Sequence, residues 1–304
     1  MGIGPFPSPA QLSNHIQDQA LLRLGQQHPD LPVPAILRHG AIIGCESFYS
    51  SRQERCMAEA RSRIAASEAA RGSFASGMVI GAGELTGGAG RFRRSWHAPP
   101  GGLWFTLVLV NTLRPHFSRL LPLMAGLACW ATLRESGLSS ARLKWVNDII
   151  LAGRKVAGIL SESLVGECSG EEYILIGLGL NVNNRDFPPE LSSSATSLAA
   201  FAGHDFDLDQ LACELLSQLR FYYGLLVYLD EGGGGDTRPF MDLYRQACDS
   251  VGRQVRYGFD VQQQPLYEAR VKGISDDGSL VMTLADGSEI SEGGGELVYL
   301  PAGS

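Results

Sequence analysis

The stretch from residue 143 to residue 164, LKWVNDIILAGRKVAGILSESL, places charged side chains inside two apolar runs. Lys144 and Asp148 interrupt the first run, and the turn at residues 152–154 leads to Lys155. Alternation along a single strand would put Lys144 and Asp148 on the same side of it. Charges within an apolar hairpin are costly unless they are paired or used. The pattern therefore allows a buried ion pair or a site in which lysines meet an anionic group.

A glycine-rich loop with several arginines lies at residues 83–96, GELTGGAGRFRRSW. Glycines let a loop wrap closely around a ligand and expose backbone N–H groups. Arg91, Arg93 and Arg94 offer forked donors to a phosphate or a carboxylate. The loop is therefore predicted to order around an anionic ligand, and the alternative is a mobile surface loop with solvated arginines. It matches neither the P-loop pattern nor a Rossmann fingerprint.

The spacing of the histidines and cysteines predicts no metal centre. The six histidines show no ligand spacing, and His97, between a tryptophan and two prolines, is interpreted as structural. The six cysteines contain no CxxC pair, which is typical of reduced thiols in the cytoplasm. With a net charge of −7, no long apolar run and no signal peptide, the chain is predicted to be cytoplasmic, without binding to nucleic acid or membranes.

Periodicity predicts a mixed α+β chain of 304 residues around these segments. Helices are expected at about 10–24, 51–71, 122–136, 208–228 and 238–249. Strands are expected at 41–49, 78–82, 103–110, 144–163 (as a hairpin) and 173–179. Four glycines at 232–235 predict a flexible break. Residues 252–300, with the turn pairs Asp277-Gly278 and Asp286-Gly287, predict a small all-β barrel.

Four segments in this order, followed by the β tail, resemble the biotin protein ligases over about residues 41–300. Residues 46–52, ESFYSSR, resemble the family's E-S-x-D-S-T-N segment, and residues 88–101 resemble its GRGRRGRxWxSPPG loop. Residues 144–160 resemble its KWPND hairpin, and residues 177–183, GLGLNVN, resemble its GxGxN strand end.

The resemblance implies a fold and a division into domains. The expected fold has a mixed sheet with packed helices, like the class II aminoacyl-tRNA synthetases and the biotin/lipoate ligase catalytic domain, followed by an SH3-like barrel. The implied divisions are an N-terminal extension at 1–40, a catalytic domain at 41–235, and a linker helix with the SH3-like domain at 236–304. The extension is too short for a winged-helix DNA-binding domain, so the implied form is the one that lacks this domain.

The implied activity is that of an AMP-forming ligase. Such an enzyme uses ATP and Mg²⁺ to convert biotin to biotinyl-AMP, and transfers biotin to a lysine of a biotin carboxyl carrier protein or domain. Homodimers occur in the family. The loop must close over the activated biotin, because water would destroy the mixed anhydride.

The resemblance also implies roles for individual residues of this chain. The expected catalytic residues are Lys155 and Arg91, and Asp148 is the candidate Mg²⁺ ligand. The expected biotin-binding residues are Ser50, Ser51, Leu85, Gly88, Trp145, Lys155 and Gly158. The expected nucleotide-binding residues are Arg91, Arg94, Trp96, Asn147 and Asn181.

The chain departs from the family pattern within these segments. Leu85 stands where the family usually has Gln, Ala89 replaces a loop arginine, and Arg52 replaces the Asn of S-T-N. Losing one neutral hydrogen bond costs about 0.5–1.5 kcal/mol, which is roughly tenfold in binding. Two alternatives therefore stay open. One is a degenerate biotin- or nucleotide-binding module of the same fold, and the other is a ligase for a different carboxylate such as lipoate.

Overall fold

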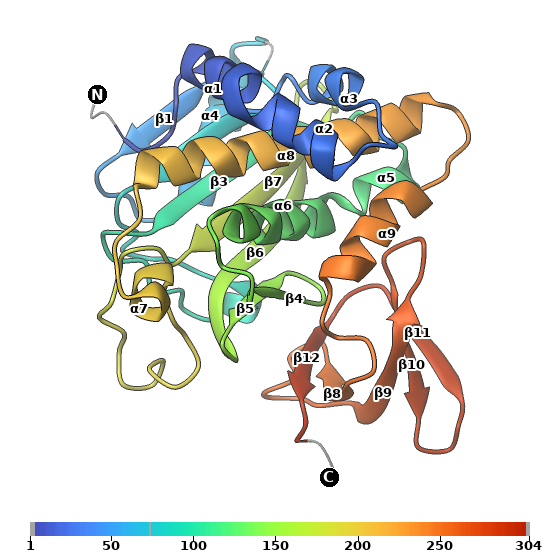
Figure 1. The fold of residues 1–304 in the computed structure, drawn as a ribbon. Coiled ribbons are helices and arrows are strands. Elements are labelled where there is room, and N and C mark those ends of the chain that lie inside the picture. Colours follow the sequence, from blue (N-terminus) through green and yellow to red (C-terminus); the bar gives the residue numbers. More distant parts are fainter. Residues whose placement is uncertain (1–3, 73, 302–304) are drawn as a thin grey trace.

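A mixed seven-stranded sheet forms the centre of the molecule (Figure 1). The computed structural model describes residues 4–72 and 74–301. The strands of this sheet are β1 (Ser47–Ser50), β2 (Met78–Ala82), β3 (Leu103–Val110), β4 (Arg142–Lys144), β5 (Asp148–Leu151), β6 (Arg154–Val165) and β7 (Glu172–Leu180). Their order is β1-β2-β3-β7-β6-β5-β4, and only β1 and β2 run parallel. The predicted mixed sheet is therefore confirmed.

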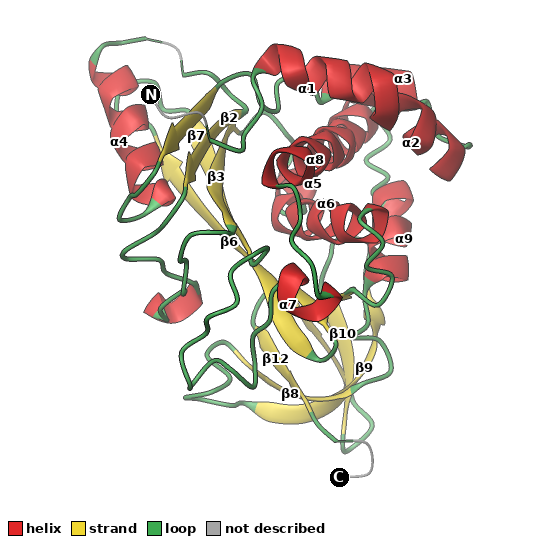
Figure 2. Cartoon of the chain, turned by 60° about the vertical axis from the view of Figure 1, so that its left-hand side comes forward, coloured by secondary structure: helices red, strands yellow, loops and turns green. Residues whose placement is uncertain are grey.

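Helices cover both faces of this sheet (Figure 2). Helix α4 lies against one face, and α6 lies against the other with α8 and the N-terminal helices beyond it. The α-helices are α1 (Pro9–His15), α2 (Leu21–Gln27), α3 (Val33–His39), α4 (Cys56–Ala69), α5 (Pro115–Ser118), α6 (Leu121–Glu135), α7 (Leu198–Ala202), α8 (Leu208–Glu231) and α9 (Arg238–Ala247). No helix in the described ranges is long and apolar enough to cross a membrane.

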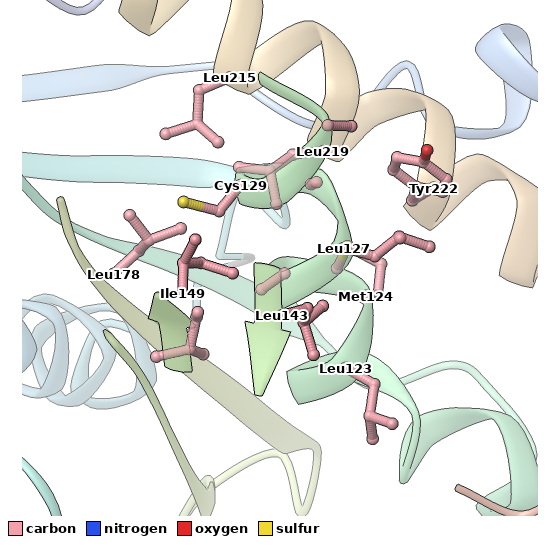
Figure 3. Packing of buried hydrophobic residues seen from close by; sticks show 14 of the residues in the cluster. Leu123, Met124, Leu127, Cys129, Leu143, Ile149, Leu178, Leu215, Leu219 and Tyr222 are labelled. Atoms are coloured by element: carbon pink, nitrogen blue, oxygen red, sulfur yellow. The ribbon is translucent and has the colours of Figure 1, made fainter. Parts of the chain in front are cut away.

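The main core lies between α6, α8 and the sheet (Figure 3). Leu127 of α6 and Leu219 of α8 are buried there with Ile149 of β5. The N-terminal segment belongs to the same core, because Leu12 and Ile36 are buried in it. The predicted helix at 10–24 is confirmed as α1, a π-helical turn and α2, whereas α3 was not predicted. The division at residue 40 stays a prediction.

The C-terminal residues form a separate antiparallel sheet. Its strands are β8 (Gln254–Gly258), β9 (Tyr267–Ile274), β10 (Leu280–Leu284), β11 (Glu289–Glu292) and β12 (Glu296–Tyr299), in the order β11-β10-β9-β8-β12. The two predicted turns are confirmed, since Gly278 has φ 83° and Gly287 has φ 85°. Within the described chain no pairing joins β11 to β12, so the sheet does not close into the expected barrel.

Two predicted strands differ from the structure. The first run of the hairpin is not one strand, because the chain reverses at residues 145–147 and β4 pairs with β5. Lys144 then lies directly opposite Asp148 across the two strands. The reversal is held by distant groups: the Trp145 N–H donates to Ser250 Oγ at 3.0 Å, and the Ile159 N–H donates to the Asn147 carbonyl at 3.0 Å. The alternation of apolar and polar residues along one strand carries no information about hydrogen-bond partners that are distant in the sequence.

The predicted strand at residues 41–49 is also mostly wrong. Residues 41–46 form turns, with the Cys45 N–H donating to the Ile42 carbonyl at 3.0 Å and Gly44 at φ 75°.

The predicted tight turn before Lys155 is confirmed. Ala152 and Gly153 both have positive φ, which is the conformation that a two-residue hairpin turn requires.

A buried carboxylate fixes the far end of the sheet. Glu68 of α4 is 6% exposed and accepts hydrogen bonds from the Tyr173 hydroxyl at 2.6 Å and the Ser169 hydroxyl at 2.7 Å. The N–H groups of Cys168 and Ser169 also donate to it, each at 2.9 Å. These bonds, that of Tyr173 first, lower the pKa of Glu68 from 4.5 to about 2.

We therefore expect Glu68→Gln to have a lower free energy of unfolding than the wild type at neutral pH. In acid the difference between the two proteins should disappear. A carboxyl whose pKa is depressed by folding stabilises the protein above its unfolded pKa. This contribution disappears as the pH falls from about 4.5 towards about 2. Urea unfolding of the two proteins across this range checks the effect, with Glu59→Gln on the same helix as control. A wild-type advantage that did not shrink in acid would contradict it.

Candidate active site

A cavity of about 580 Å³ opens where the central sheet, the glycine–arginine loop and the C-terminal sheet meet. The loop is the segment at residues 83–96. Strands β6 and β7 supply the floor, and β4, β5 and the start of β6 supply the charged wall. Most of the predicted site residues line this cavity. They are Leu85, Gly88, Arg91, Arg94, Trp96, Trp145, Asn147, Asp148, Lys155, Gly158 and Asn181.

The floor of the cavity is made of glycines on neighbouring strands. Gly158 of β6 lies opposite Gly179 of β7. The Trp96 indole occupies the space that side chains would take there, since a β-carbon on Gly179 would lie 2.6 Å from Trp96 Nε1. That indole nitrogen is buried and has no hydrogen-bond partner in the structure. The glycines therefore let a flat group approach the floor closely, and in this structure that group is the Trp96 indole.

The charged wall contains two lysines and one carboxylate. Lys155 Nζ lies 2.6 Å from Asp148 Oδ1, with side-chain exposures of 36% and 24%. The predicted ion pair therefore exists, but Lys155 rather than Lys144 makes it. Lys144 Nζ lies 5.3 Å from the centre of the Tyr299 ring, and no carboxylate in the described chain lies within ion-pair distance of it. The wall thus carries one more positive than negative charge.

Electrostatics in this wall favour a bound anion. Burial raises the pKa of the Asp148 carboxyl, but the Lys155 and Lys144 cations outweigh burial and hold the pKa below its ordinary value. Burial lowers the pKa of Lys144 despite the opposing charge of Asp148. An incoming phosphate or carboxylate would relieve the repulsion between the two lysines.

Arg91 and Arg94 of the loop contact the C-terminal residues. Arg91 Nη1 donates to the Gly295 carbonyl at 2.6 Å. Arg94 donates to both oxygens of Glu296, at 3.1 Å and 2.6 Å, and to Asp260 Oδ1 at 2.6 Å. Both arginines line the cavity, but Arg94 already forms three hydrogen bonds to two carboxylates.

The side chains of Asn147 and Asn181 both form hydrogen bonds within the protein. The Asn147 amide donates to the Ile159 carbonyl, which supports the reversal between β4 and β5. Asn181 is 3% exposed at the end of β7, and its side-chain oxygen accepts from Asn184 Nδ2 at 3.1 Å. Both line the cavity, Asn181 as a buried polar wall.

Some expected biotin contacts lie elsewhere. Ser50 and Ser51 are absent from the described lining, and the Ser50 hydroxyl donates to the Arg52 carbonyl at 3.0 Å. Leu85 lines both the cavity and a neighbouring hollow of about 730 Å³. Trp145 is 2% exposed and its indole N–H donates to the Gly278 carbonyl at 3.1 Å, so it mainly packs between the two sheets.

Other cavity residues had no signal in the sequence. Glu296, Leu297 and Val298 come from the C-terminal sheet, and Met57 comes from the start of α4. None of them belongs to a recognisable local pattern. His97 also lines the cavity, and its Nε2–H can donate to the Asp186 carbonyl at 3.0 Å, so its structural role stays a prediction. No group of three or more potential metal-binding side chains lies within the described residues.

Comparisons with known proteins agree with this architecture. Residues 63–181 match the model of the biotin/lipoate A/B protein ligase family. The bifunctional ligase/repressor BirA of Bacillus subtilis is 30% identical over 225 residues, which cover 73% of this chain and 66% of that protein. The biotin--[acetyl-CoA-carboxylase] ligase of Mycobacterium tuberculosis is 29% identical over 237 residues, which cover 76% of this chain and 82% of that one. The chain thus spans slightly less than two thirds of the Bacillus relative.

Solved structures share the fold. The biotin protein ligase from Aquifex aeolicus in complex with biotin and ATP superposes with a TM-score of 0.68 at 23% identity. The match covers 84% of this chain and 99% of that one. The biotin protein ligase from Leishmania major in complex with biotinyl-5-AMP gives a TM-score of 0.53 at 20% identity, covering 81% and 98%.

Proposed function

Because the chain belongs to the biotin/lipoate A/B protein ligase family, we propose that it activates biotin with ATP and attaches it to a carrier lysine. The observation that carries this proposal is the placement of Lys155 and Lys144 beside a glycine floor, under a loop that can exclude water. In the first step a biotin carboxylate oxygen bonds to the α-phosphorus of ATP, and pyrophosphate leaves. In the second, the carrier amine bonds to the biotinyl carbonyl and AMP leaves.

Lys155 is the proposed catalytic cation of the first step. The α-phosphate gains negative charge as the carboxylate attacks, and a fixed ammonium beside it stabilises that charge. Its ion pair with Asp148 holds Lys155 at the edge of the floor, where its ammonium lies 5.3 Å from the centre of the Trp96 ring. Arg91, whose side chain also lines the cavity, is proposed as the second cation.

Asp148 fits a Mg²⁺ ion that arrives with the nucleotide. Magnesium usually binds one or two carboxylates and completes its shell with phosphate oxygens and water. Asp148 lines the cavity and is proposed as one such ligand, for which it would have to release Lys155. The described residues contain no group of three or more potential metal-binding side chains, so a cage made of protein groups alone is not available there. The ion would neutralise phosphate charge during activation.

We propose that Gly88, Gly158 and Leu85 contact biotin and that Trp96, Asn147 and Asn181 contact the nucleotide. The support is that all six residues line the same cavity. Ser50 and Ser51 would need a rearrangement to contact biotin, because they lie outside the described lining. Trp145 lines the cavity but is 2% exposed, so little of it is open to a ligand.

The proposal also covers the acceptor protein and the C-terminal sheet. The proposed acceptor is a biotin carboxyl carrier protein or domain, and its support is that the Mycobacterium relative is a ligase for acetyl-CoA-carboxylase. The C-terminal sheet is proposed to be of the SH3-like kind on the basis of its five antiparallel strands. A homodimer, a cytoplasmic location and the lack of DNA binding remain predictions.

The proposal predicts ATP–pyrophosphate exchange that depends on biotin, followed by transfer to a carrier. Incubation with biotin, Mg²⁺, ATP and a biotin carboxyl carrier domain should add one biotinyl group to that domain in mass spectrometry. A folded protein that shows no exchange at saturating biotin would contradict the proposal. A non-catalytic binding module would bind biotin in calorimetry without exchange.

A ligase for lipoate is the second candidate. Two observations favour it: the family description names both lipoate and biotin, and the apolar Leu85 lines the cavity. The same exchange assay with lipoate and octanoate in place of biotin separates the two, since the preferred acid should give the higher kcat/KM.

A further inference from the structure

The contact between the glycine–arginine loop and the C-terminal sheet is more than a surface ion pair. One Arg94 guanidinium donates three hydrogen bonds to two carboxylates, those of Glu296 and Asp260. The side chains of Arg94, Asp260 and Glu296 are 35%, 26% and 15% exposed. Forked bonds between partly buried groups hold geometry better than exposed pairs do. We call these three residues the clasp.

The C-terminal sheet builds the acidic half of the clasp. Glu296 begins β12 and lies opposite Gly258 at the end of β8, so Asp260 follows two residues beyond that point. The Tyr257 hydroxyl donates to the Gly294 carbonyl at 2.6 Å and fixes the turn before Glu296. Residues more than 160 positions from Arg94 in the sequence are thereby held against the loop.

A second contact joins the same two segments. Arg91 donates to the Gly295 carbonyl at 2.6 Å, next to Glu296. Among the described residues Arg91 makes no hydrogen bond to a carboxylate, whereas Arg94 bonds to two. The two arginines lie on the same short loop but have different partners.

The clasp and the lysine wall differ in net charge. The clasp has two carboxylates for one guanidinium and thus an excess of negative charge. The wall has Lys144 and Lys155 for one Asp148. A polyphosphate would be repelled by the first and attracted by the second. A role for Arg94 as a direct phosphate ligand would require it to leave both carboxylates.

We propose that Arg94 is a positioning residue, and that Glu296 and Asp260 hold the glycine–arginine loop over the cavity through it. The C-terminal sheet thus determines how long the loop stays closed. In the proposed ligase reaction, this closure retains the activated acid until the acceptor amine arrives. The inference rests on the proposed function for this last role only, because closure of the loop can be measured without substrate.

Amide hydrogen exchange in the ligand-free protein tests the clasp itself. We expect Arg94→Glu and Glu296→Arg each to raise exchange at residues 84–97 by about tenfold, as expected for losing charged hydrogen bonds. The double variant, Arg94→Glu with Glu296→Arg, reverses both charges and should restore slow exchange. Arg94→Gln is the milder variant should Arg94→Glu fail to fold.

The control comes from the same sheet. Arg256 pairs with Glu268 at 2.7 Å on β8 and β9 but does not reach the loop, so Arg256→Glu should leave exchange at residues 84–97 unchanged. Unchanged loop exchange in the folded single variants would overturn the clasp. A double variant that stayed as loose as the single variants would also overturn it.

A turnover measurement separates positioning from direct binding. With biotin and Mg-ATP but no acceptor, AMP release reports escape of the activated acid into water. We expect about tenfold faster release in Arg94→Gln, with KM for ATP nearly unchanged. A raised KM for ATP with unchanged loop exchange would instead make Arg94 a nucleotide ligand. A wild-type protein without any biotin-dependent turnover would refute the proposed function and leave the exchange result standing.

Discussion

Replacing Lys155 with alanine should lower biotin-dependent ATP–pyrophosphate exchange by about 10²–10³-fold. The loss has this size because a charge placed where negative charge develops contributes several kcal/mol in a site shielded from water. Lys155 lines the cavity and is 36% exposed, so an incoming α-phosphate can compete with Asp148 for its ammonium. Initial rates of exchange at saturating biotin and ATP measure the effect.

The chain offers a matched control for this substitution. Lys272 of β9 pairs with Glu289 at 2.5 Å, is 57% exposed, and lies outside the cavity lining. Lys272→Ala should leave exchange unchanged. Because Lys155→Ala also leaves Asp148 without its partner, thermal unfolding should be compared in parallel, and Lys155→Ala combined with Asp148→Asn removes that complication. Exchange within a few-fold of wild type in folded Lys155→Ala would contradict the assigned role.

The second large effect should come from the cavity floor. Gly179→Val puts a branched side chain where a β-carbon alone would lie 2.6 Å from Trp96 Nε1 and 2.7 Å from Trp96 Cε2. Valine suits a strand, so we expect the sheet to form while the indole and any ligand lose their place on the floor. Overpacking costs about 1–3 kcal/mol. We expect this cost to fall on the ligand-bound state, where it would weaken binding by roughly tenfold or more. Calorimetric titration with biotin measures the loss.

Gly273→Val is the matched control for the floor variant. Gly273 lies on β9 of the C-terminal sheet, its φ is not positive, and a β-carbon there would meet no heavy atom within 4 Å. Its biotin affinity should equal that of the wild type. If Gly179→Val bound biotin as tightly as Gly273→Val, the glycine floor would not be the binding surface.

The mixed sheet and many element positions could be predicted from sequence because they depend on local rules. Apolar runs identified β2, β3 and β7, and helical spacing identified α6 and α8. The turn at Ala152 and Gly153 followed from residue type, as did the hairpin turns of the tail. Residue chemistry marked Lys155 and Arg91, and the family resemblance added Trp96; the structure brings all three to one cavity.

The tertiary structure alone decided how those charges are paired. The sequence determined that a carboxylate and two lysines lie close together in the chain. The structure pairs Asp148 with Lys155, although the reversal at residues 145–147 places Lys144 opposite Asp148. It also determined that arginines crowd the glycine loop, while the C-terminal sheet decided that Arg94 meets Glu296 and Asp260. Local periodicity reports which face a side chain shares with its neighbours. Which distant group neutralises a charge depends on long-range packing, and no local pattern encodes it.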